Sequence, residues 1–446
     1  MTNASGLTKL RQYPFDRPLM KHHSKLIRLA SLSLALILSG CSAVKVYDEN
    51  KELGHMAAVT GRTIASDTGG QSIIVALQNA DSGKVEDAYA QPYEGYYLFM
   101  APPGRYRVAA FLDRNNDFTH QTESEEAAQS AILELKAGDF IKHQNLLLKA
   151  GNTAIPGALK EIVIGGDTGD EFANFSIGNI VSLDDGRFSQ TNASTGLWRP
   201  MTFLKEQRPG IYFLEPYTPE KIPVLFIHGI NGSPADFRQM AKALDKERYQ
   251  PWFVYYSSGI QLKVTAAYIM RWLNTLRAEY GFNEIAVIAH SMGGLVAKST
   301  LHFLRQQSSH PELATRALAF VSFATPWNGH PSAQLGVDYS PVVLGAWRDI
   351  SPNSEFMNWL HEQPMPRGMR YTLVFAYKGG FGKGLSGDGT VPLASQLWEG
   401  MQFRSQSLIG IDTDHDGILT HPASLETLRH ALDSVQTAPA LISAKP

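Results

Sequence analysis

The serine at position 291 lies in a sequence context that could make it a nucleophile. The motif AHSMGG at residues 289–294 follows the apolar segment 284–289 and precedes a segment, 295–304, with a helical pattern. A serine on a tight strand-to-helix turn with small neighbours presents its hydroxyl to a substrate, and the usual pattern is Gly-x-Ser-x-Gly. Ala289 replaces the first glycine and adds only one methyl group. The motif therefore predicts that Ser291 attacks carbonyl carbons.

A serine hydroxyl of this kind needs a histidine to take its proton and a carboxylate to orient that histidine. On this type of turn the chain order is serine, acid, histidine. Asp388 lies in the segment SGDGTVP after a predicted strand, and His415 lies in DHDGIL after the next one. We predict both as partners of the serine, with His421 as the alternative base. His290 is not expected to be the base, because adjacent side chains on a sharp turn point apart.

Strands and helices alternate from about residue 216 onward, which is the pattern that must position these residues. Continuous apolar runs are typical of strands buried on both faces of a sheet. They are found at residues 224–227, 252–256, 284–289, 317–323 and 371–375. Helical spacing of apolar residues lies between several of them. Repeated units of this kind predict a mainly parallel sheet covered by helices.

The segments around the serine, the acid and the histidine resemble those of α/β-hydrolase esterases and lipases, including small bacterial triacylglycerol lipases and the GPI-inositol-deacylase-like branch. TPWNG at residues 325–329 and RDISPNSEF at 348–356 also resemble lipase segments. The resemblance covers residues 216–436. It implies an α/β-hydrolase fold with a cap insertion at about 328–368 and hydrolysis of carboxylic esters, particularly lipid or acyl esters, without metal or organic cofactor. The aromatic residues of the cap either line an acyl site or only pack the cap on the sheet.

The segment HGINGS at residues 228–233 resembles the His-Gly oxyanion segment of lipases. Pre-placed backbone N–H groups stabilise the negative oxygen of a tetrahedral intermediate. The resemblance implies the Ile230 amide as one donor, and the residue after the serine, Met292, supplies the other. His228 is expected to hold this loop in place rather than to act as a catalyst.

The amino-terminal residues have the pattern of a secretory signal. Basic residues precede the apolar run 29–40, which is too short for a membrane span of roughly twenty residues. Met1 and Met20 both fit as its start. The segment LSGC at residues 38–41 resembles the bacterial lipobox, in which the cysteine is acylated and becomes the first mature residue.

This resemblance implies a signal peptide over residues 1–40 and a lipid attached to Cys41. Two or three acyl chains anchor a protein far better than one. Ser42 follows the cysteine where inner-membrane retention would favour Asp. We therefore expect a lipid-anchored protein of the bacterial cell envelope, at the outer membrane.

Residues 57–150 contain short alternating runs separated by turn signals, which predict an all-β sandwich. GYYLF and PPGRY in this stretch resemble transthyretin-like or carboxypeptidase-regulatory-like accessory domains. A ligand of the cell envelope is a possible partner for it. Residues 41–56 are predicted as a tether, 151–215 as a connector and 437–446 as a tail.

One loop of the predicted sandwich begins like a calcium-binding loop. Oxygen ligands alternate over Asp113–Asp117. Phe118 stands where an EF-hand needs glycine and Ser124 where it needs glutamate, so an EF-hand is excluded. An irregular calcium site using Glu123 or Glu125 stays open, and a polar loop between strands is favoured.

Composition restricts the remaining classes of function. Of 446 residues, 43% are hydrophobic and 18% charged, which excludes a largely disordered chain. Lys plus Arg number 40 against 42 Asp plus Glu, so no basic excess points to nucleic acid. The single cysteine excludes an internal disulfide and a cysteine-rich metal site. We predict a membrane-anchored serine hydrolase with no metal; the alternatives are an amidase or peptidase with the same triad, or a non-catalytic envelope binding or assembly lipoprotein.

Overall fold

The structure is a computed structural model that describes residues 41–65, 68–149, 151, 155, 175–306, 315–379 and 387–435. The predicted signal peptide 1–40 and tail 437–446 lie outside the described residues. The chain divides into two compact units, residues 1–48 and 49–446. Helix α2 (Cys41–His55) occupies the segment predicted as the tether. Among the helices of the described residues, none combines the length and the hydrophobicity of a membrane span.

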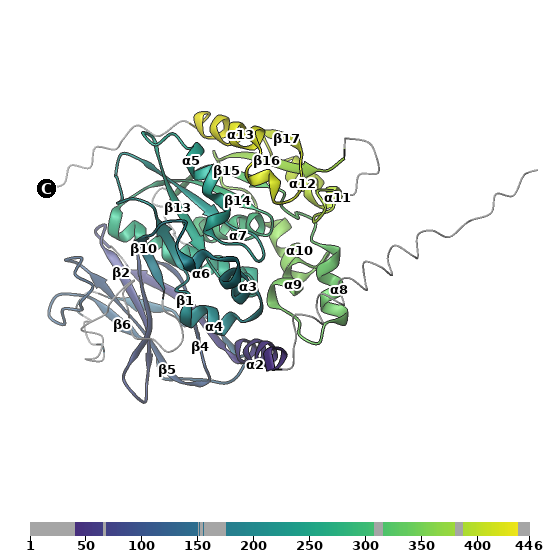
Figure 1. The fold of residues 1–446 in the computed structure, drawn as a ribbon. Helices are drawn as coiled ribbons and strands as arrows, with labels where there is room; N and C mark the ends of the chain where they lie inside the picture. The colour runs from purple at the N-terminus through teal and green to yellow at the C-terminus, as the bar shows by residue number, and fades with distance from the viewer. Residues whose placement is uncertain are drawn as a thin grey trace, which may run out of the picture. The chain divides into compact units, whose positions relative to one another are not determined.

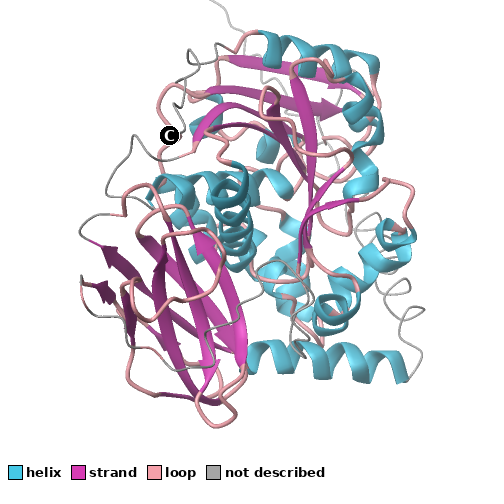
Figure 2. Ribbon diagram, turned by 90° about the vertical axis from the view of Figure 1, so that its left-hand side faces the viewer, coloured by secondary structure: helices cyan, strands magenta, loops and turns pink. Residues whose placement is uncertain are grey.

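Two β-sheets form a sandwich over residues 57–148 (Figure 2). One sheet has the order β4-β1-β8, with β9 also paired to β1, and the other has the order β3-β2-β5-β6, with β7 paired to β5. Their bounds are β1 (Ala57–Ala65), β2 (Ser72–Asn79), β3 (Val85–Gln91), β4 (Gly95–Ala101), β5 (Gly104–Asp113), β6 (Ala127–Gln129), β7 (Leu133–Leu135), β8 (Phe140–Ile141) and β9 (Leu146–Leu148). Alternate residues such as Val59 and Phe99 from one sheet and Val75 and Val108 from the other form the core between them.

An eight-stranded sheet forms the rest of the fold, in the order β10-β11-β13-β12-β14-β15-β16-β17 (Figure 1). All neighbours are parallel except β11 and β13, which are antiparallel. The strands are β10 (Ser176–Ile180), β11 (Gly210–Phe213), β12 (Ile222–Ile227), β13 (Tyr249–Tyr255), β14 (Glu284–His290), β15 (Arg316–Phe323), β16 (Arg370–Tyr377) and β17 (Ser407–Asp412). The predicted fold, an α/β-hydrolase fold with a mainly parallel sheet preceded by a small all-β sandwich, is confirmed.

Helices cover both faces of this sheet, which explains why its central strands are apolar throughout. Leu225 and Ile227 of β12 pack with α6 and α7 on one face, and Val224 and Phe226 pack with α5 and α13 on the other. The helices of this part are α3 (Gln190–Trp198), α4 (Pro200–Glu206), α5 (Arg238–Ala243), α6 (Leu262–Tyr280), α7 (Gly293–Gln306), α8 (Pro331–Tyr339), α9 (Gly345–Ile350), α10 (Glu355–Glu362), α11 (Leu393–Gln396), α12 (Glu399–Gln402) and α13 (Pro422–Asp433).

The stretch 151–215, which the sequence indicated as a connector, contributes to this sheet in its described part. Strands β10 and β11 form its first two positions, and helices α3 and α4 lie between them in the chain. The connector assignment is corrected to that extent. Both strands are short, at five and four residues, so neither is long enough to show a period.

Helix α6 also joins the sandwich to the large sheet. Arg271 of α6 is 2% exposed and donates two hydrogen bonds, of 2.9 and 2.7 Å, to the carboxylate of Asp87 on β3. Its guanidinium lies 4.0 Å from the centre of the Tyr89 ring and donates to the carbonyl oxygen of Leu98 on β4. The arginine thus occupies the side of the sandwich where the edge strands β3 and β4 lie together.

The loop that begins like a calcium site is closed by its own hydrogen bonds. Asp113 accepts from the amides of Asp117 and Phe118, at 3.2 and 3.1 Å. Glu125 accepts from the amides of Arg114 and Gln121, at 2.8 and 2.9 Å. The carboxylates are therefore used to shape a polar loop between β5 and β6.

Candidate active site

Ser291 lies on the turn between β14 and α7, as the motif predicts. Its φ is +54°, a left-handed conformation that a residue with a side chain adopts only under strain and that is typical of functional turns. The turn is held because the Ser291 amide donates to the carbonyl oxygen of Phe323 at 2.8 Å, and the Gly294 amide donates to the Ser291 carbonyl oxygen at 3.0 Å.

Gly293 and Gly294 are needed because the helix starts against β12 and against the segment after β15. A Cβ atom on Gly293 would lie 2.3 Å from the carbonyl oxygen of Ile227, and one on Gly294 would lie 2.0 Å from the hydroxyl of Thr325. Both contacts are closer than real Cβ atoms approach. The motif thus reflects close packing of strand and helix, as well as chemistry.

The structure brings together the three residues that the sequence predicts as a catalytic group. His415 Nε2 lies 2.9 Å from Ser291 Oγ, and His415 Nδ1 lies 2.7 Å from Asp388 Oδ2. All three are buried; their exposed fractions are 5% for Ser291, 8% for His415 and 1% for Asp388. His421, the alternative base, caps α13 instead, because its Nδ1 accepts from the Ala423 amide at 3.2 Å.

The carboxylate of Asp388 is fixed by donors on both of its oxygens. Oδ1 accepts from the amides of Thr390 and Val391, at 2.9 and 2.7 Å. Oδ2 accepts from Nε2 of Gln396 at 3.1 Å, in addition to His415. Gln396 is fully buried, and its Oε1 accepts from the Ala376 amide of β16 at 2.8 Å. Sequence reasoning missed this glutamine, because nothing but its place shortly after the acid turn marks it.

His290 contacts the backbone of the histidine loop. Its Nε2 lies 2.9 Å from the carbonyl oxygen of His415, and the two imidazole centres are 4.7 Å apart. Burial, together with the nearby His415, holds the pKa of His290 well below its usual value. The ring is therefore neutral near pH 7, and its Nε2 carries the proton that it donates to this carbonyl.

The loop after β12 is held by contacts to α3 and to the segment after β13. His228 is fully buried and stacks on Tyr256 at 4.2 Å, while the Tyr256 hydroxyl donates to the His228 carbonyl oxygen at 2.7 Å. Burial lowers the pKa of His228 to about 4, so it is neutral. The amide of Asn231 donates to the hydroxyl of Ser258 at 2.9 Å, and its side-chain oxygen accepts from the hydroxyl of Ser194.

The amides of the two predicted oxyanion donors lie at this loop and at the elbow. Within the part of the chain that the structure describes, neither the Ile230 nor the Met292 amide donates a hydrogen bond to the protein. Gly229, the neighbour of Ile230, is so close to the elbow that a Cβ on it would lie 2.7 Å from Ser291 Cβ. Two amides near the serine are thus free to bind an oxygen that becomes negative.

Helices α8, α9 and α10 fall inside the predicted cap insertion. The cap is joined to the acid turn, because His330 Nε2 lies 2.7 Å from the carbonyl oxygen of Thr390. Trp327 is fully buried against Phe320 and Tyr371 of the sheet, and Trp359 packs on Phe303 of α7. Trp327 thus packs on the sheet and Trp359 packs on α7.

One group of possible metal ligands occurs among the described residues. Ligand atoms of His290, His415 and Asp416 lie within 4.8 Å of one another. Both ring nitrogens of His415 already contact Asp388 and Ser291, and Nε2 of His290 contacts a carbonyl oxygen. A metal ion here would compete with the hydrogen bonds to the serine and the acid.

Part of the chain matches a known protein family. Residues 219–349, less than a third of the chain, match the family described as "Putative serine esterase (DUF676)". The match contains Ser291 and the loop at 228–233, and it ends before Asp388 and His415. A comparison with curated proteins gave no match.

Solved structures that are similar to this chain include three bacterial or metagenomic proteins. The lin2722 gene product of Listeria innocua is 16% identical over 49% of this chain and 96% of its own, with a TM-score of 0.36. The mature lipase BlEst2 of Bacillus licheniformis is 21% identical over 48% and 95%, with a TM-score of 0.37. The metagenomic carboxyl esterase MGS0156 is 18% identical over 45% and 66%, with a TM-score of 0.34. The family match confirms the prediction that the chain is an enzyme, a serine hydrolase of carboxylic esters.

Proposed function

We propose that Ser291, His415 and Asp388 form a catalytic triad that hydrolyses lipid or acyl esters through an acyl-enzyme. The observation that carries the proposal is the unbroken set of hydrogen bonds from Ser291 Oγ through His415 to Asp388, at 2.9 and 2.7 Å, on a strained turn. The supporting family match includes the serine and ends at residue 349, before the acid and the histidine.

In the first half of the reaction Ser291 Oγ forms a bond to the ester carbonyl carbon while its proton passes to His415 Nε2. The carbonyl oxygen becomes negative and accepts hydrogen bonds from the Ile230 and Met292 amides. His415 then returns the proton to the alkoxy oxygen, the carbon–oxygen bond breaks and the alcohol leaves. Asp388 holds the imidazole in the tautomer with Nδ1–H and stabilises its positive charge.

In the second half a water molecule replaces the alcohol. His415 takes a proton from the water, whose oxygen attacks the acyl carbon, and the same two amides stabilise the second intermediate. Return of the proton to Ser291 Oγ releases the carboxylic acid. The ester and one water are thus the two reactants, and the named residues transfer the protons, supply the first nucleophile and stabilise the oxyanion.

A fluorophosphonate probe tests the nucleophile, because it labels activated serines. Wild-type protein should be labelled, and Ser291→Ala should lose the label and at least about 10⁴-fold in kcat. Ser299→Ala is the control and should keep both, because this serine of α7 donates its hydroxyl to the Leu295 carbonyl oxygen. Labelling of Ser291→Ala at the wild-type rate would contradict the triad, since another serine would then be the activated one, and a wild type that is not labelled would favour a non-catalytic envelope protein.

A series of p-nitrophenyl esters of rising chain length, with one matching anilide, tests the substrate class. A kcat/KM that rises with chain length and exceeds that for the anilide supports hydrolysis of lipid esters. Preference for the anilide would instead support an amidase or peptidase with the same triad.

We further propose that the protein is anchored in the bacterial cell envelope, at the outer membrane, by acyl chains on Cys41. The support is the sequence pattern of residues 29–41. Metabolic labelling with a palmitate analogue should mark the wild-type chain and leave Cys41→Ala unmarked. Absence of label in the wild type, or label that survives Cys41→Ala, would refute the anchor.

A further inference from the structure

A groove of about 520 Å³ lies between the sandwich and helix α6. Its volume falls in the range of about 300–1,000 Å³ that is usual for sites of small ligands. Apolar side chains from both parts line it: Ala58, Leu98 and Met100 from the sandwich and Val264, Ala267 and Met270 from α6. None of the three triad residues lines it, so it is separate from the proposed active site.

The register of the sandwich explains why this groove is apolar. In the sheet β4-β1-β8, Ala58 is paired with Met100 on one side and with Phe140 on the other. Residues two apart on a strand share a face. Tyr96 lies on the same face as Met100 and, like Phe140, lines the groove; these two rings are 45% and 56% exposed. Exposed apolar groups on one sheet face beside a groove indicate a binding surface.

Two lysines supply positive charge at the groove. Lys263 lines the groove, with its Nζ 4.2 Å from the centre of the Trp359 ring, and Lys142 lies 4.9 Å from the centre of the Phe140 ring. Among the described residues, no Asp or Glu lies within ion-pair distance of either lysine. Burial lowers the pKa of Lys263, and the positive charge of Lys142 lowers it further. The carboxylates of Glu355 and Asp349 raise this pKa from beyond ion-pair distance.

Among the described residues that line the groove, the one acidic residue already accepts a hydrogen bond. Asp139 accepts a hydrogen bond from the Lys136 amide at 2.9 Å, which closes the turn before β8. An apolar groove with two cations therefore complements a ligand with a long apolar chain and a single negative group. A neutral apolar ligand would offer no negative group to the two ammonium groups. An extended peptide has backbone N–H and C=O groups that need hydrogen bonds, and these apolar side chains cannot form them.

We propose that this groove binds a long-chain fatty-acid anion, with the chain on the apolar residues and the carboxylate between Lys263 and Lys142. The proposal is independent of the triad, because binding of an acid needs no turnover. A long-chain acid is also the product that hydrolysis of a lipid ester would release.

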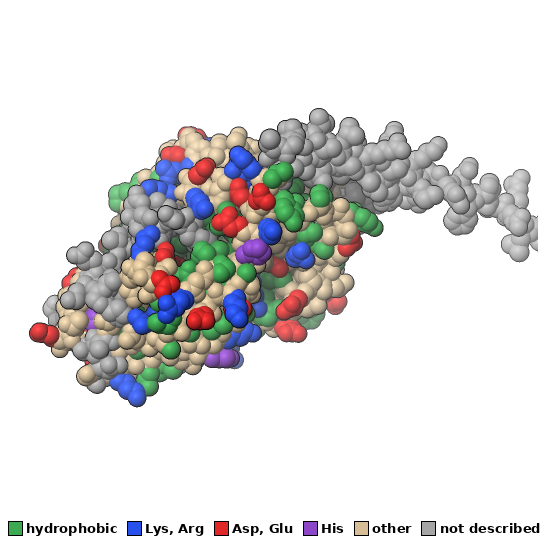
Figure 3. All heavy atoms as spheres, turned by 90° about the horizontal axis from the view of Figure 1, so that it is seen from below, with side chains coloured by type: hydrophobic (Ala, Val, Ile, Leu, Met, Phe, Trp, Pro, Cys, Tyr) green, Lys and Arg blue, Asp and Glu red, His purple; other side chains and the backbone are tan. Residues whose placement is uncertain are grey.

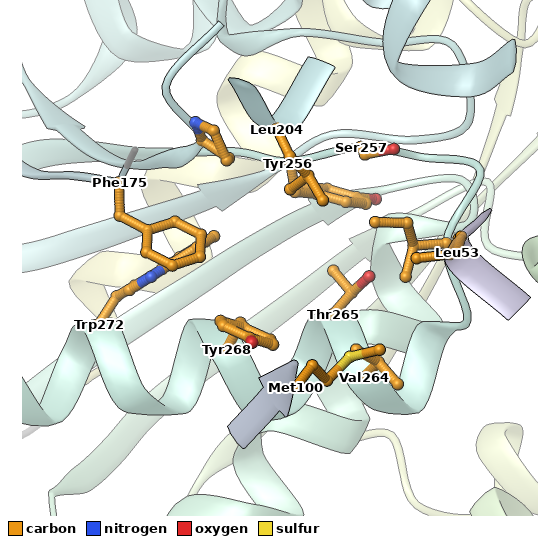
Figure 4. A pocket seen from close by; sticks show the side chains of 12 residues that line it. Leu53, Met100, Phe175, Leu204, Tyr256, Ser257, Val264, Thr265, Tyr268 and Trp272 are labelled. Atoms are coloured by element: carbon orange, nitrogen blue, oxygen red, sulfur yellow. The ribbon is translucent and has the colours of Figure 1, made fainter. Parts of the chain in front are cut away.

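The groove shares three of its side chains with a smaller apolar cavity. Leu53, Met100 and Val264 line the groove and also this cavity of about 40 Å³, which Figure 4 shows. Tyr256, on the opposite wall of the cavity in Figure 4, stacks on His228 of the oxyanion loop. A bound chain would therefore touch side chains that reach toward the loop next to Ser291.

Titration of the full-length chain with cis-parinaric acid, a fluorescent C18 fatty acid, tests the site. Binding should saturate at one equivalent, and palmitate should displace the probe at least about tenfold better than hexadecanol, which has the same chain and no charge. Changing both Lys263→Ala and Lys142→Ala should weaken palmitate binding by about tenfold, as expected for two exposed ion pairs, and remove this preference. Lys242→Ala with Lys246→Ala, two exposed lysines away from the groove, should change neither.

A second variant tests the groove itself. Ala58→Phe places a bulky ring on the groove face of β1, where aromatic residues suit a strand, and should reduce binding of the probe at least about tenfold. Binding that survives both the lysine changes and Ala58→Phe, or equal displacement by palmitate and hexadecanol, would overturn the proposal. Binding only to vesicles of anionic phospholipid, with no displacement by palmitate, would also overturn it, since a membrane surface would then be the partner.

Discussion

The imidazole of His290 donates a hydrogen bond of 2.9 Å to the backbone carbonyl oxygen of His415, the residue that contacts the Ser291 hydroxyl. His290, which precedes the proposed nucleophile, thus holds the loop that carries His415, 125 positions away in the chain. Because burial keeps the pKa of His290 low, the ring stays neutral and adds no positive charge beside an imidazole that must become charged. His290 is in this sense a positioning residue for the proposed triad.

Replacing His290 should therefore affect kcat more than KM. His290→Phe removes the donor, and we expect kcat for a p-nitrophenyl ester to fall by about 10–100-fold, since a displacement near 1 Å can cost about 10² in rate. His290→Gln keeps a side-chain N–H and should recover part of this loss. His430→Phe, at an exposed site on α13, is the control and should keep the wild-type kcat. A wild-type kcat in His290→Phe would show that the histidine loop is held by other contacts.

Gln396 offers a second test, because its Nε2 donates to Asp388 Oδ2 at 3.1 Å and to two backbone carbonyl oxygens. Gln396→Ala should lower kcat by about tenfold. Gln396→Glu removes the N–H donor at nearly the same side-chain size and should lower kcat by a similar factor. Gln402→Glu, whose side chain contacts Leu397 instead, should leave kcat unchanged. A wild-type kcat in both Gln396→Ala and Gln396→Glu would show that Asp388 is held by its other donors alone.

Features that are encoded in short contiguous stretches of the sequence could be predicted. The elbow at Ser291 is a contiguous motif, and Asp388 and His415 are selected by chain order and by short turns after strands. The strands at the centre of the large sheet are apolar because helices cover both of their faces, so composition alone marks them. Charged and polar side chains intermingle on the face of the molecule in Figure 3, in keeping with a net charge of −2.

Features that depend on contacts between distant segments could not be predicted. Gln396 and His290 act through neighbours that only the folded chain supplies, and Asp87 and Arg271 meet across 184 positions. The edge strand β10 and its neighbour β11 are too short for a period, so their place in the sheet follows from the pairing of β10 with β11 and of β11 with β13, and not from their own residues.

The ion pair between Arg271 and Asp87 should be important for the stability of the chain. Their side chains are 2% and 13% exposed, and removal of one partner leaves the other charge buried. We expect Arg271→Leu or Asp87→Leu to lower the free energy of unfolding by about 3–5 kcal/mol, measured by urea denaturation. Arg105→Leu, which breaks the exposed pair with Asp81, should cost less than about 1 kcal/mol. Equal losses in both pairs would contradict a special role of the buried pair.

Lys298 predicts a pH dependence of stability. This lysine of α7 is 2% exposed, and its Nζ donates to the carbonyl oxygens of Leu360 and Gln363 at the end of the cap helix α10. Burial, with a smaller effect of Arg404, lowers its pKa from 10.5 to about 7. The nearby His302 does not titrate in this range, since burial lowers its pKa to about 4.

Whether stability rises or falls with pH follows from the number of protons that the folded and unfolded chains bind. Below pH 7 the folded and unfolded chains both hold the Lys298 proton, and burial of the charge reduces stability in full. Between pH 7 and 10.5 only the unfolded chain holds it, so this residue makes stability rise with pH, by at most about 1.4 kcal/mol per unit. The free energy of unfolding, compared at pH 6, 8 and 10, should rise in wild type relative to Lys298→Met, while Lys242→Met at an exposed site should follow wild type. A constant difference between wild type and Lys298→Met across this range would mean that Lys298 keeps its proton in the folded chain.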